Sequence, residues 1–185
     1  MIPEAQRRQL LEIARDAIAA TLGRASSQIH PTDGFLAREA GAFVTLHIHG
    51  ELRGCIGQVE ADRPLADVVA SCAVSAARSD PRFPPVTAEE LDTVDIEVSV
   101  LSGFDPVHSI ADIEVGRHGL LIESGWRRGL LLPQVATEWQ WDAETFLSQT
   151  CRKAGLPPDS WKHAPTVKLW RFEAEVFGEK EQRNS

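Results

Sequence analysis

Cys55 is the residue of this 185-residue chain whose type and neighbours point most clearly to chemistry. It lies in the segment Leu52-Arg53-Gly54-Cys55-Ile56-Gly57, and glycine weakens a strand and often marks a place where a ligand or another backbone comes close. A cysteine becomes a nucleophile when a nearby base or cation favours its thiolate, from a free pKa of about 8.5. Arg53 and His47 could supply that neighbour. The alternative is that Cys55 is a small residue filling a crowded strand.

The remaining cysteines suggest no disulfide framework and no metal cage. The chain has three cysteines in all, too few and too scattered for either. Cys72 and Cys151 fall on the apolar stripes of expected helices, which predicts buried thiols. His47 and His49 could chelate a metal together with Cys55. Histidines spaced by two are more often solvated surface residues, so we predict no metal site.

Further polar residues are candidates for substrate binding or proton transfer. Arg82, in the proline-rich segment 80–85, could hold a carboxylate or phosphate with two parallel bonds, or could pair with Asp80. His118 could be a general acid or base near neutral pH, or a loop histidine that caps a backbone carbonyl. Glu97 points away from the apolar face of its strand, so it is either an acid in a cleft or a solvated carboxylate.

Trp126 is expected at the tip of a hairpin, beside Arg127 and Arg128. An exposed aromatic next to arginines is a common anchor for a protein partner. The alternative is that it packs within the fold, as we expect of the other tryptophans.

Composition and charge exclude several classes of protein. An apolar content of 43% is ordinary for a globular domain. The net charge of -8 argues against nucleic acid, because binding to phosphate backbones depends on Lys and Arg. No apolar run is long enough to cross a bilayer, and the polar amino terminus lacks the apolar stretch of a signal peptide. These features predict a cytoplasmic protein that binds no membrane.

The apolar periodicity predicts an α+β fold with antiparallel strands. Spacings of three and four predict helices over 3–22, 64–79 and 142–154, and alternation predicts strands over 42–48, 52–59, 94–100, 119–124, 129–132 and 166–177. Thr87 and Glu90 form a capping box for a short helical turn. The polar stretch from Arg24 to Gly34 is expected to be a loop.

The register of the first hairpin decides which side chains share a face with Cys55. A loop of Gly50 and Glu51 would mix polar and apolar residues on both faces of the sheet. A three-residue loop that also includes Leu52 places Val44, Leu46, Ile48 and Ile56 together on the core side. That register pairs His47 with Cys55, and we prefer it.

Several short segments of this sequence resemble those of the AMMECR family, also called AmmeMemoRadiSam system protein A. The resemblance covers about residues 34–177 and rests on Leu52–Gly57 followed or preceded, in the family's order, by 41–46, 80–85, 96–101, 116–120, 131–136 and 153–157. It implies two antiparallel α+β subdomains, which we place at 1–106 plus 166–185 and at an inserted 107–165. It also implies that the Cys55 strand faces a cleft between them, and that a radical-SAM protein and a Memo-like protein are partners.

Two classes of function follow, because the activity of the family is unsettled. In the first, the chain is a cysteine-dependent enzyme acting on a large substrate, a protein or a modified metabolite. Cys55, His47 and His118 would then be the catalytic candidates, and the substrate-binding candidates would be Arg53, Gly54, Ile56, Gly57, Arg82 and Glu97. In the second, it is a binding or adaptor module that uses Leu52–Gly57 as a docking strand. The sequence does not indicate whether a cofactor is bound.

Overall fold

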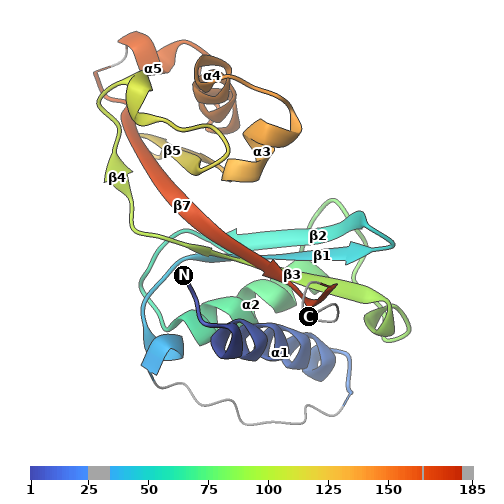
Figure 1. Cartoon of the computed structure of the whole chain (residues 1–185). Helices are drawn as coiled ribbons and strands as arrows, with labels where there is room; N and C mark the ends of the chain where they lie inside the picture. The colour runs from blue at the N-terminus through green and yellow to red at the C-terminus, as the bar shows by residue number, and fades with distance from the viewer. Residues whose placement is uncertain (25–33, 164, 181–185) are drawn as a thin grey trace. The chain divides into compact units, whose positions relative to one another are not determined.

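The computed structural model describes residues 1–24, 34–163 and 165–180, which fold into two compact units (Figure 1). Unit 1 comprises Met1–Leu101 and Glu175–Ser185, and unit 2 comprises Ser102–Ala174. The expected bounds of 106/107 and 165/166 gave unit 2 fewer residues. The difference arises because Asp105 and Pro106 pair with Arg171 and Trp170, so both short stretches belong to the sheet of unit 2.

Unit 1 is an antiparallel sheet with its long helices on one face. Along the chain its elements are α1 (Glu4–Thr21), η1 (Gly34–Ala37), β1 (Ala42–Ile48), β2 (Glu51–Gln58), α2 (Leu65–Arg78), η2 (Glu90–Asp92), β3 (Val94–Leu101) and the end of β7 (Lys168–Gly178). The strand order is β2-β1-β3-β7. Figure 1 shows α1 and α2 against the same side of this sheet, so one face carries the core and the other faces away from the helices.

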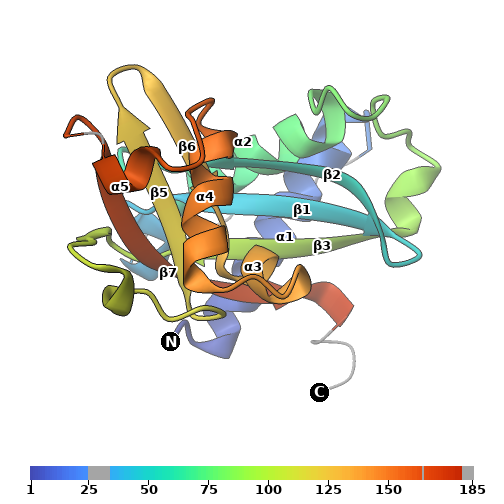
Figure 2. The same cartoon turned by 90° about the horizontal axis from the view of Figure 1, so that it is seen from above.

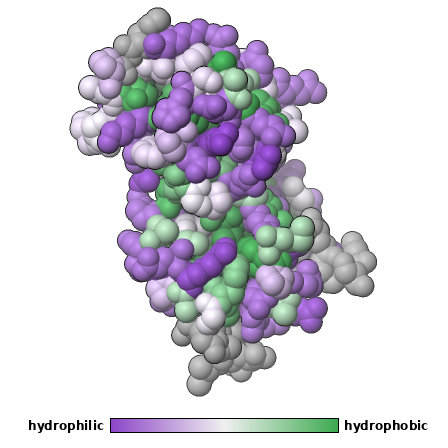
Figure 3. Space-filling view, turned by 60° about the vertical axis from the view of Figure 1, so that its left-hand side comes forward, coloured by the Kyte–Doolittle hydropathy of each residue, from purple (hydrophilic) through white to green (hydrophobic). Residues whose placement is uncertain are grey.

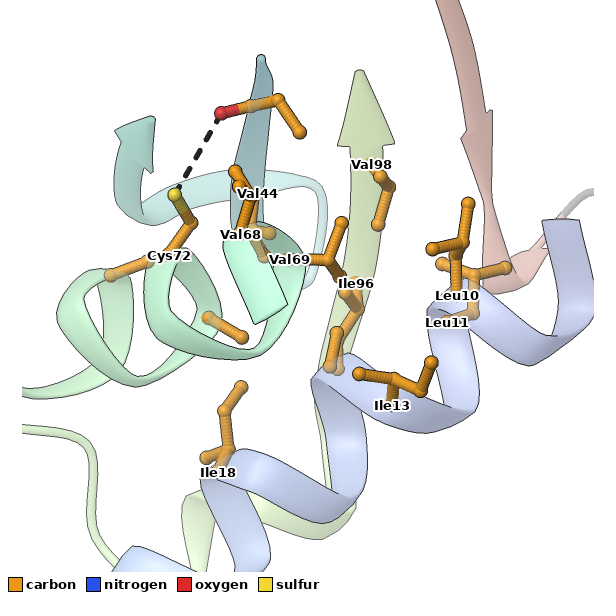
Figure 4. Packing of buried hydrophobic residues seen from close by; sticks show 14 of the residues in the cluster. Leu10, Leu11, Ile13, Ile18, Val44, Val68, Val69, Cys72, Ile96 and Val98 are labelled. Carbon is orange, nitrogen blue, oxygen red and sulfur yellow. Dashed lines mark hydrogen bonds between the residues drawn. The ribbon is translucent and has the colours of Figure 1, made fainter. Parts of the chain in front are cut away.

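The core of unit 1 explains why these segments adopt these structures. Leu10, Ile13 and Ile18 recur at helical spacing on α1 and are buried at 5% exposure or less. They meet Val68 and Val69 of α2 and the apolar side of β1 and β3, as Figure 4 shows. Cys72 is buried in the same cluster, where its Sγ lies 3.7 Å from the carbonyl oxygen of Ala42. The prediction of a buried thiol at 72 is confirmed.

The end of the chain completes unit 1. Phe177 is 1% exposed within the core of this unit. The Glu175 carboxylate accepts hydrogen bonds from the backbone N–H of Ile2 and from Arg7, and Glu179 forms an ion pair with Arg15 of α1. The last strand therefore ties both ends of the sequence to the same core.

Unit 2 has a second antiparallel arrangement with smaller helices. Its elements are β4 (Asp105–Pro106), η3 (Ile110–Asp112), β5 (His118–Ser124), β6 (Arg127–Leu131), α3 (Pro133–Glu138), α4 (Ala143–Lys153), α5 (Ser160–His163) and the first part of β7. The middle of β7 pairs with β4 on one side and β5 on the other, and β5 pairs with β6. Figure 2 shows α3 and α4 against the β5–β6 hairpin. Phe146, Leu147 and Cys151 of α4 are buried there.

The α+β class and the antiparallel pairing are confirmed, as are the predicted helices and strands to within about two residues at most ends. The capping box is also present, with Thr87 and Glu90 each accepting the other's backbone N–H. The periodicity does not predict α3, α5, η3 or β4, because these elements are too short to show a period. The loop expected from Arg24 to Gly34 lies outside the described residues at 25–33.

The face of the protein in Figure 3 presents many hydrophilic residues. On the same face, hydrophobic residues are exposed among the hydrophilic ones. Among the described residues, no helix combines the length and the apolar character needed to cross a bilayer.

Candidate functional site around Cys55

The hairpin of β1 and β2 places Cys55 opposite Thr45, which corrects the predicted pairing with His47. His49 and Gly50 both have positive φ values, 55° and 86°, and form a tight two-residue turn of the kind that suits twisted strands. Ile48 therefore pairs with Glu51, and the expected three-residue loop is wrong. Arg53 then forms a bulge, because His47 pairs with Leu52 whereas Leu46 pairs with Gly54.

The bulge restores the alternation of faces that the sequence predicted. Val44 and Leu46 are fully buried, and Ile56, opposite Val44, packs partly against the same core. Cys55 consequently points to the face without helices, which we call the outer face; it is defined here by Phe43, Thr45, Cys55 and Glu97. The predicted face of Cys55 was right although its predicted neighbour was wrong.

On the outer face the side chain of Cys55 is half-buried and has a hydroxyl neighbour. Thr45 Oγ1 donates a hydrogen bond to Cys55 Sγ at 3.2 Å. Across the next pair of strands Thr45 lies opposite Glu97, which is also half-buried. Cys55, Thr45 and Glu97 thus form a lateral row over β2, β1 and β3. A hydroxyl that donates to sulfur stabilises a thiolate only modestly, and it cannot take up a proton as an imidazole can.

The glycines beside Cys55 are explained by packing within unit 1. A Cβ on Gly54 would lie 2.3 Å from the carbonyl oxygen of Ala76, so glycine lets α2 approach the strand. A Cβ on Gly57 would lie 2.2 Å from the ring of Phe43, which covers this position from β1. Both close approaches come from the protein itself, so these glycines provide no separate sign of a ligand.

The outer edge of β2 at Cys55 is closed by the segment after α2. The backbone N–H of Cys55 donates to Asp80 Oδ2 at 2.9 Å, and its carbonyl accepts from Arg82 Nη2 at 3.3 Å. Arg82 also grips Asp80 with two parallel bonds of 3.0 and 2.7 Å. The Asp80 side chain is only 2% exposed, and the bonds from Arg82 hold its pKa far below the ordinary range. Of the two predicted roles for Arg82, the structure shows pairing with Asp80.

Arg53 is occupied by structural contacts. Its guanidinium binds both carboxylate oxygens of Glu90 at 3.0 Å and donates to the carbonyl of Pro84 at 2.9 Å. With 13% of the side chain exposed, Arg53 fixes the proline-rich segment and η2 to the bulge. It is therefore not oriented toward the thiol.

Neither histidine of the first hairpin is the direct cross-strand partner of Cys55. His47 pairs with Leu52 and, on the other side, with Asp95 of β3, while His49 is exposed in the turn. In the part of the chain that the structure describes, no group of three or more His, Cys, Asp or Glu side chains is arranged to hold a metal ion.

His118 lies in unit 2, at the start of β5, and is 7% exposed. Its Nδ1 accepts the backbone N–H of Glu114 at 2.9 Å, so the histidine caps an amide where a carbonyl was expected. Burial lowers the pKa of His118, and Arg171 and Arg117 lower it further. His118 lines a cavity of about 680 Å³ whose lining residues all belong to unit 2.

Trp126 is at the tip of the β5–β6 hairpin, where it is 88% exposed. The Arg127 guanidinium lies 5.4 Å from its ring centroid. The predicted exposure of this aromatic is confirmed, whereas its use by a partner stays a prediction.

Sequence reasoning missed Thr45 as the neighbour of Cys55 and Asp80 as its edge partner. Strand alternation did place Thr45 on the correct face, and the bulge alone decided its pairing. Asp80 had been named only as a possible partner of Arg82. Nothing in the local pattern indicated that its carboxylate would reach the backbone of β2, which is 25 residues away in sequence.

Comparison with known proteins places this geometry in one family. The AMMECR1 family model matches residues 11–177. A protein of Methanothermobacter thermautotrophicus is 52% identical over 180 residues, covering 93% of each chain. One of Methanocaldococcus jannaschii is 50% identical over 151 residues, covering 77% of this chain and 75% of the other. The crystal structure of the uncharacterised protein PH0010 from Pyrococcus horikoshii superposes with a TM-score of 0.88 at 41% identity, over 97% of this chain and 94% of that one. The chain belongs to the AMMECR1 family.

Proposed function

We propose that this chain is a protein-binding module that docks a partner on the outer face of its β2-β1-β3 sheet, around Cys55. The observation that carries the proposal is that the two faces of this sheet differ. Both long helices cover one face, and the other presents Phe43, Thr45, Cys55 and Glu97. A mixed row of one aromatic, small and acidic side chains is suited to contact with a partner's side chains.

The partner would bind the face of β2 and not its edge. Strand addition needs unpaired N–H and C=O groups along an edge. At Cys55 both groups are already bonded, to Asp80 and to Arg82. The docking role predicted for Leu52–Gly57 is therefore proposed in altered form, through the outward side chains of this strand and its neighbour.

The proposed partners are the radical-SAM protein and the Memo-like protein that the family resemblance implies, acting together in the cytosol as an AmmeMemoRadiSam system. Isothermal titration of the purified chain with each protein tests this directly. Thr45→Arg places a long charged side chain on the outer face and should abolish binding. Thr21→Arg, at the exposed end of α1, is the matched control and should bind normally. Equal binding by both variants would show that the outer face is not the docking surface.

Cysteine-dependent chemistry on a large substrate is the second candidate, and the bond from Thr45 Oγ1 to Cys55 Sγ supports it. The two proposals differ at one atom. Cys55→Ser keeps a small polar group in place, so a binding module should keep its affinity, whereas an enzyme should lose its turnover. Alkylation by iodoacetamide at pH 7 adds an internal comparison, because burial raises the pKa of both Cys72 and Cys151. A Cys55 that reacts no faster than those two would exclude the enzyme proposal.

A further inference from the structure

The cavity of unit 2 contains an arginine whose hydrogen-bonding capacity is largely unused. Arg171, on β7, lines the cavity and is 32% exposed. A guanidinium has five N–H donors. Within the described part of the chain, Arg171 makes one hydrogen bond, from Nη1 to the carbonyl of Asp112, and one long contact of 4.0 Å from Nε to Asp105. The half-buried cation therefore has several donors available to another molecule.

His118 adds a second available donor to the same cavity. The ring accepts the N–H of Glu114 on Nδ1, so the neutral imidazole carries its proton on Nε2. No acceptor for Nε2–H is found in the residues that the structure describes. On the sheet His118 pairs with Glu173, two residues from Arg171, which puts His118 and Arg171 on the same face as diagonal neighbours.

The acidic residues around the cavity are mostly engaged elsewhere. Asp112 accepts the backbone N–H groups of His108 and Ser109 and so caps η3. Glu114 and Glu173 both bind Arg117, at 3.2 and 2.9 Å. The Asp105 side chain is 73% exposed to solvent. Of the two arginines that line the cavity, Arg117 is paired with Glu114 and Glu173, whereas the nearest ion pair of Arg171 is its 4.0 Å contact with the exposed Asp105.

The electrostatic environment of His118 agrees with this view. Its pKa is lowered first by burial, and each of the two arginines then has a larger effect on it than either Glu173 or Glu114. A lowered pKa keeps the imidazole neutral near pH 7, so its Nε2–H remains available as a hydrogen-bond donor.

We propose that this cavity binds a small molecule through an oxyanion, a carboxylate or a phosphate, held by the Arg171 guanidinium and by Nε2–H of His118. A volume of about 680 Å³ suits a metabolite-sized ligand. The half-buried ring of Phe104, packed on Phe172 at 5.2 Å between centroids, offers an apolar contact for the rest of the molecule. This site lies within unit 2 and is independent of the docking face proposed for unit 1.

Nuclear magnetic resonance of the full chain tests the site with two probes, inorganic phosphate and benzoate, at constant ionic strength. We expect at least one probe to shift the Nε–H signal of Arg171 and the Nε2 signal of His118 saturably. Saturation by phosphate alone assigns a phosphate-bearing ligand, and saturation by benzoate alone assigns a carboxylate. Arg171→Gln should weaken binding about tenfold, as the loss of a charge-assisted bond does. Arg152→Gln, at an exposed position of α4, should leave it unchanged.

A second variant covers the case in which Arg171→Gln does not fold. Asp105→Asn removes the carboxylate that competes for Arg171 and should tighten binding about threefold, because an exposed charge at this distance has a modest effect. The proposal is overturned if neither probe gives a saturable shift, or if Asp105→Asn binds no more tightly than the wild type.

Discussion

The surroundings of Cys55 in unit 1 and the cavity of His118 in unit 2 use the same kinds of side chain in opposite ways. Around Cys55, Arg53 and Arg82 each bind a carboxylate with two bonds and also a backbone carbonyl. In the cavity, Arg171 makes a single hydrogen bond among the described residues. An arginine near a candidate site therefore indicates ligand binding only when its own hydrogen bonds have been counted. A guanidinium whose donors are all bonded within the protein stabilises the fold, whereas one with donors left over can bind a ligand.

Packing should show the largest difference between the two regions. Gly54→Ala would bring a methyl group to 2.3 Å from the backbone of α2, and we expect a loss of about 3 kcal/mol in the free energy of unfolding. Gly103→Ala, on the rim of the cavity, meets nothing within 4 Å and should cost less than about 0.5 kcal/mol. Urea denaturation of both variants measures this. Similar losses would contradict the contrast between a closed and an open region.

The two arginines themselves provide the next comparison. Arg82→Met leaves the Asp80 carboxylate buried with only backbone donors, and we expect a loss of about 2 kcal/mol. Arg171→Met leaves no buried charge behind and should cost about 0.5 kcal/mol. The same denaturation experiment measures both losses. A larger loss for Arg171→Met than for Arg82→Met would show that the donors of Arg171 are engaged within the fold.

Acid should affect the two regions over different ranges of pH. The pKa of His118 is lowered in the folded protein, so the unfolded chain binds a proton first as the pH falls below about 6.5, and stability decreases from there toward the folded pKa. The pKa of Asp80 is also lowered, but for an acid a lowered pKa stabilises the fold at every pH above about 3.9. This stabilisation by the Asp80 carboxylate is lost only as the pH falls below that value.

Stability curves at pH 7.5 and 5.5 separate these effects. The wild type should lose stability between the two values, and His118→Gln should lose less. The cost of Arg82→Met should be the same at both. A wild-type protein as stable at pH 5.5 as at 7.5 would argue against a neutral, buried His118.

The smallest effect is expected at the thiol. Thr45→Val removes the hydroxyl that donates to Cys55 Sγ and keeps the shape of the side chain. Stability should change by less than about 0.5 kcal/mol, because the position is half-buried and strand valines are favourable. Alkylation of Cys55 should slow by about threefold as the thiolate loses its donor. An unchanged rate would mean that this bond has no influence on the sulfur.

The sequence was sufficient for most of the fold and for one part of the site. Periodicity located α1, α2, α4 and the long strands, since apolar spacing follows directly from which face is buried. It also placed Cys55 on the outer face. The neighbour of Cys55 could not be predicted, because a positive φ at His49 and a bulge at Arg53 shift the register without altering the alternation. Short elements such as α3 left no period to detect.

The contacts that distinguish the two regions are also beyond the reach of local patterns. Asp80 and Cys55 are 25 residues apart, and His118 and Arg171 come together only through pairing of β5 with β7. His118 is a candidate for its chemistry alone, and His47 is one because the preferred register pairs it with Cys55. The structure pairs His47 with Leu52 and not with Cys55, and it places His118 in the other unit, on the same face as the Arg171 guanidinium.

The path of β7 has a consequence for how the protein is made. Its first residues belong to unit 2, and its last residues, with Phe177 in the core, belong to unit 1. A ribosome releases β7 after every other helix and strand of the two units, so the first hundred residues are synthesised well before the strand that completes their core. During that interval α1 lacks the glutamates that bind Arg7 and Arg15, and the emerging chain exposes an apolar surface that invites chaperones.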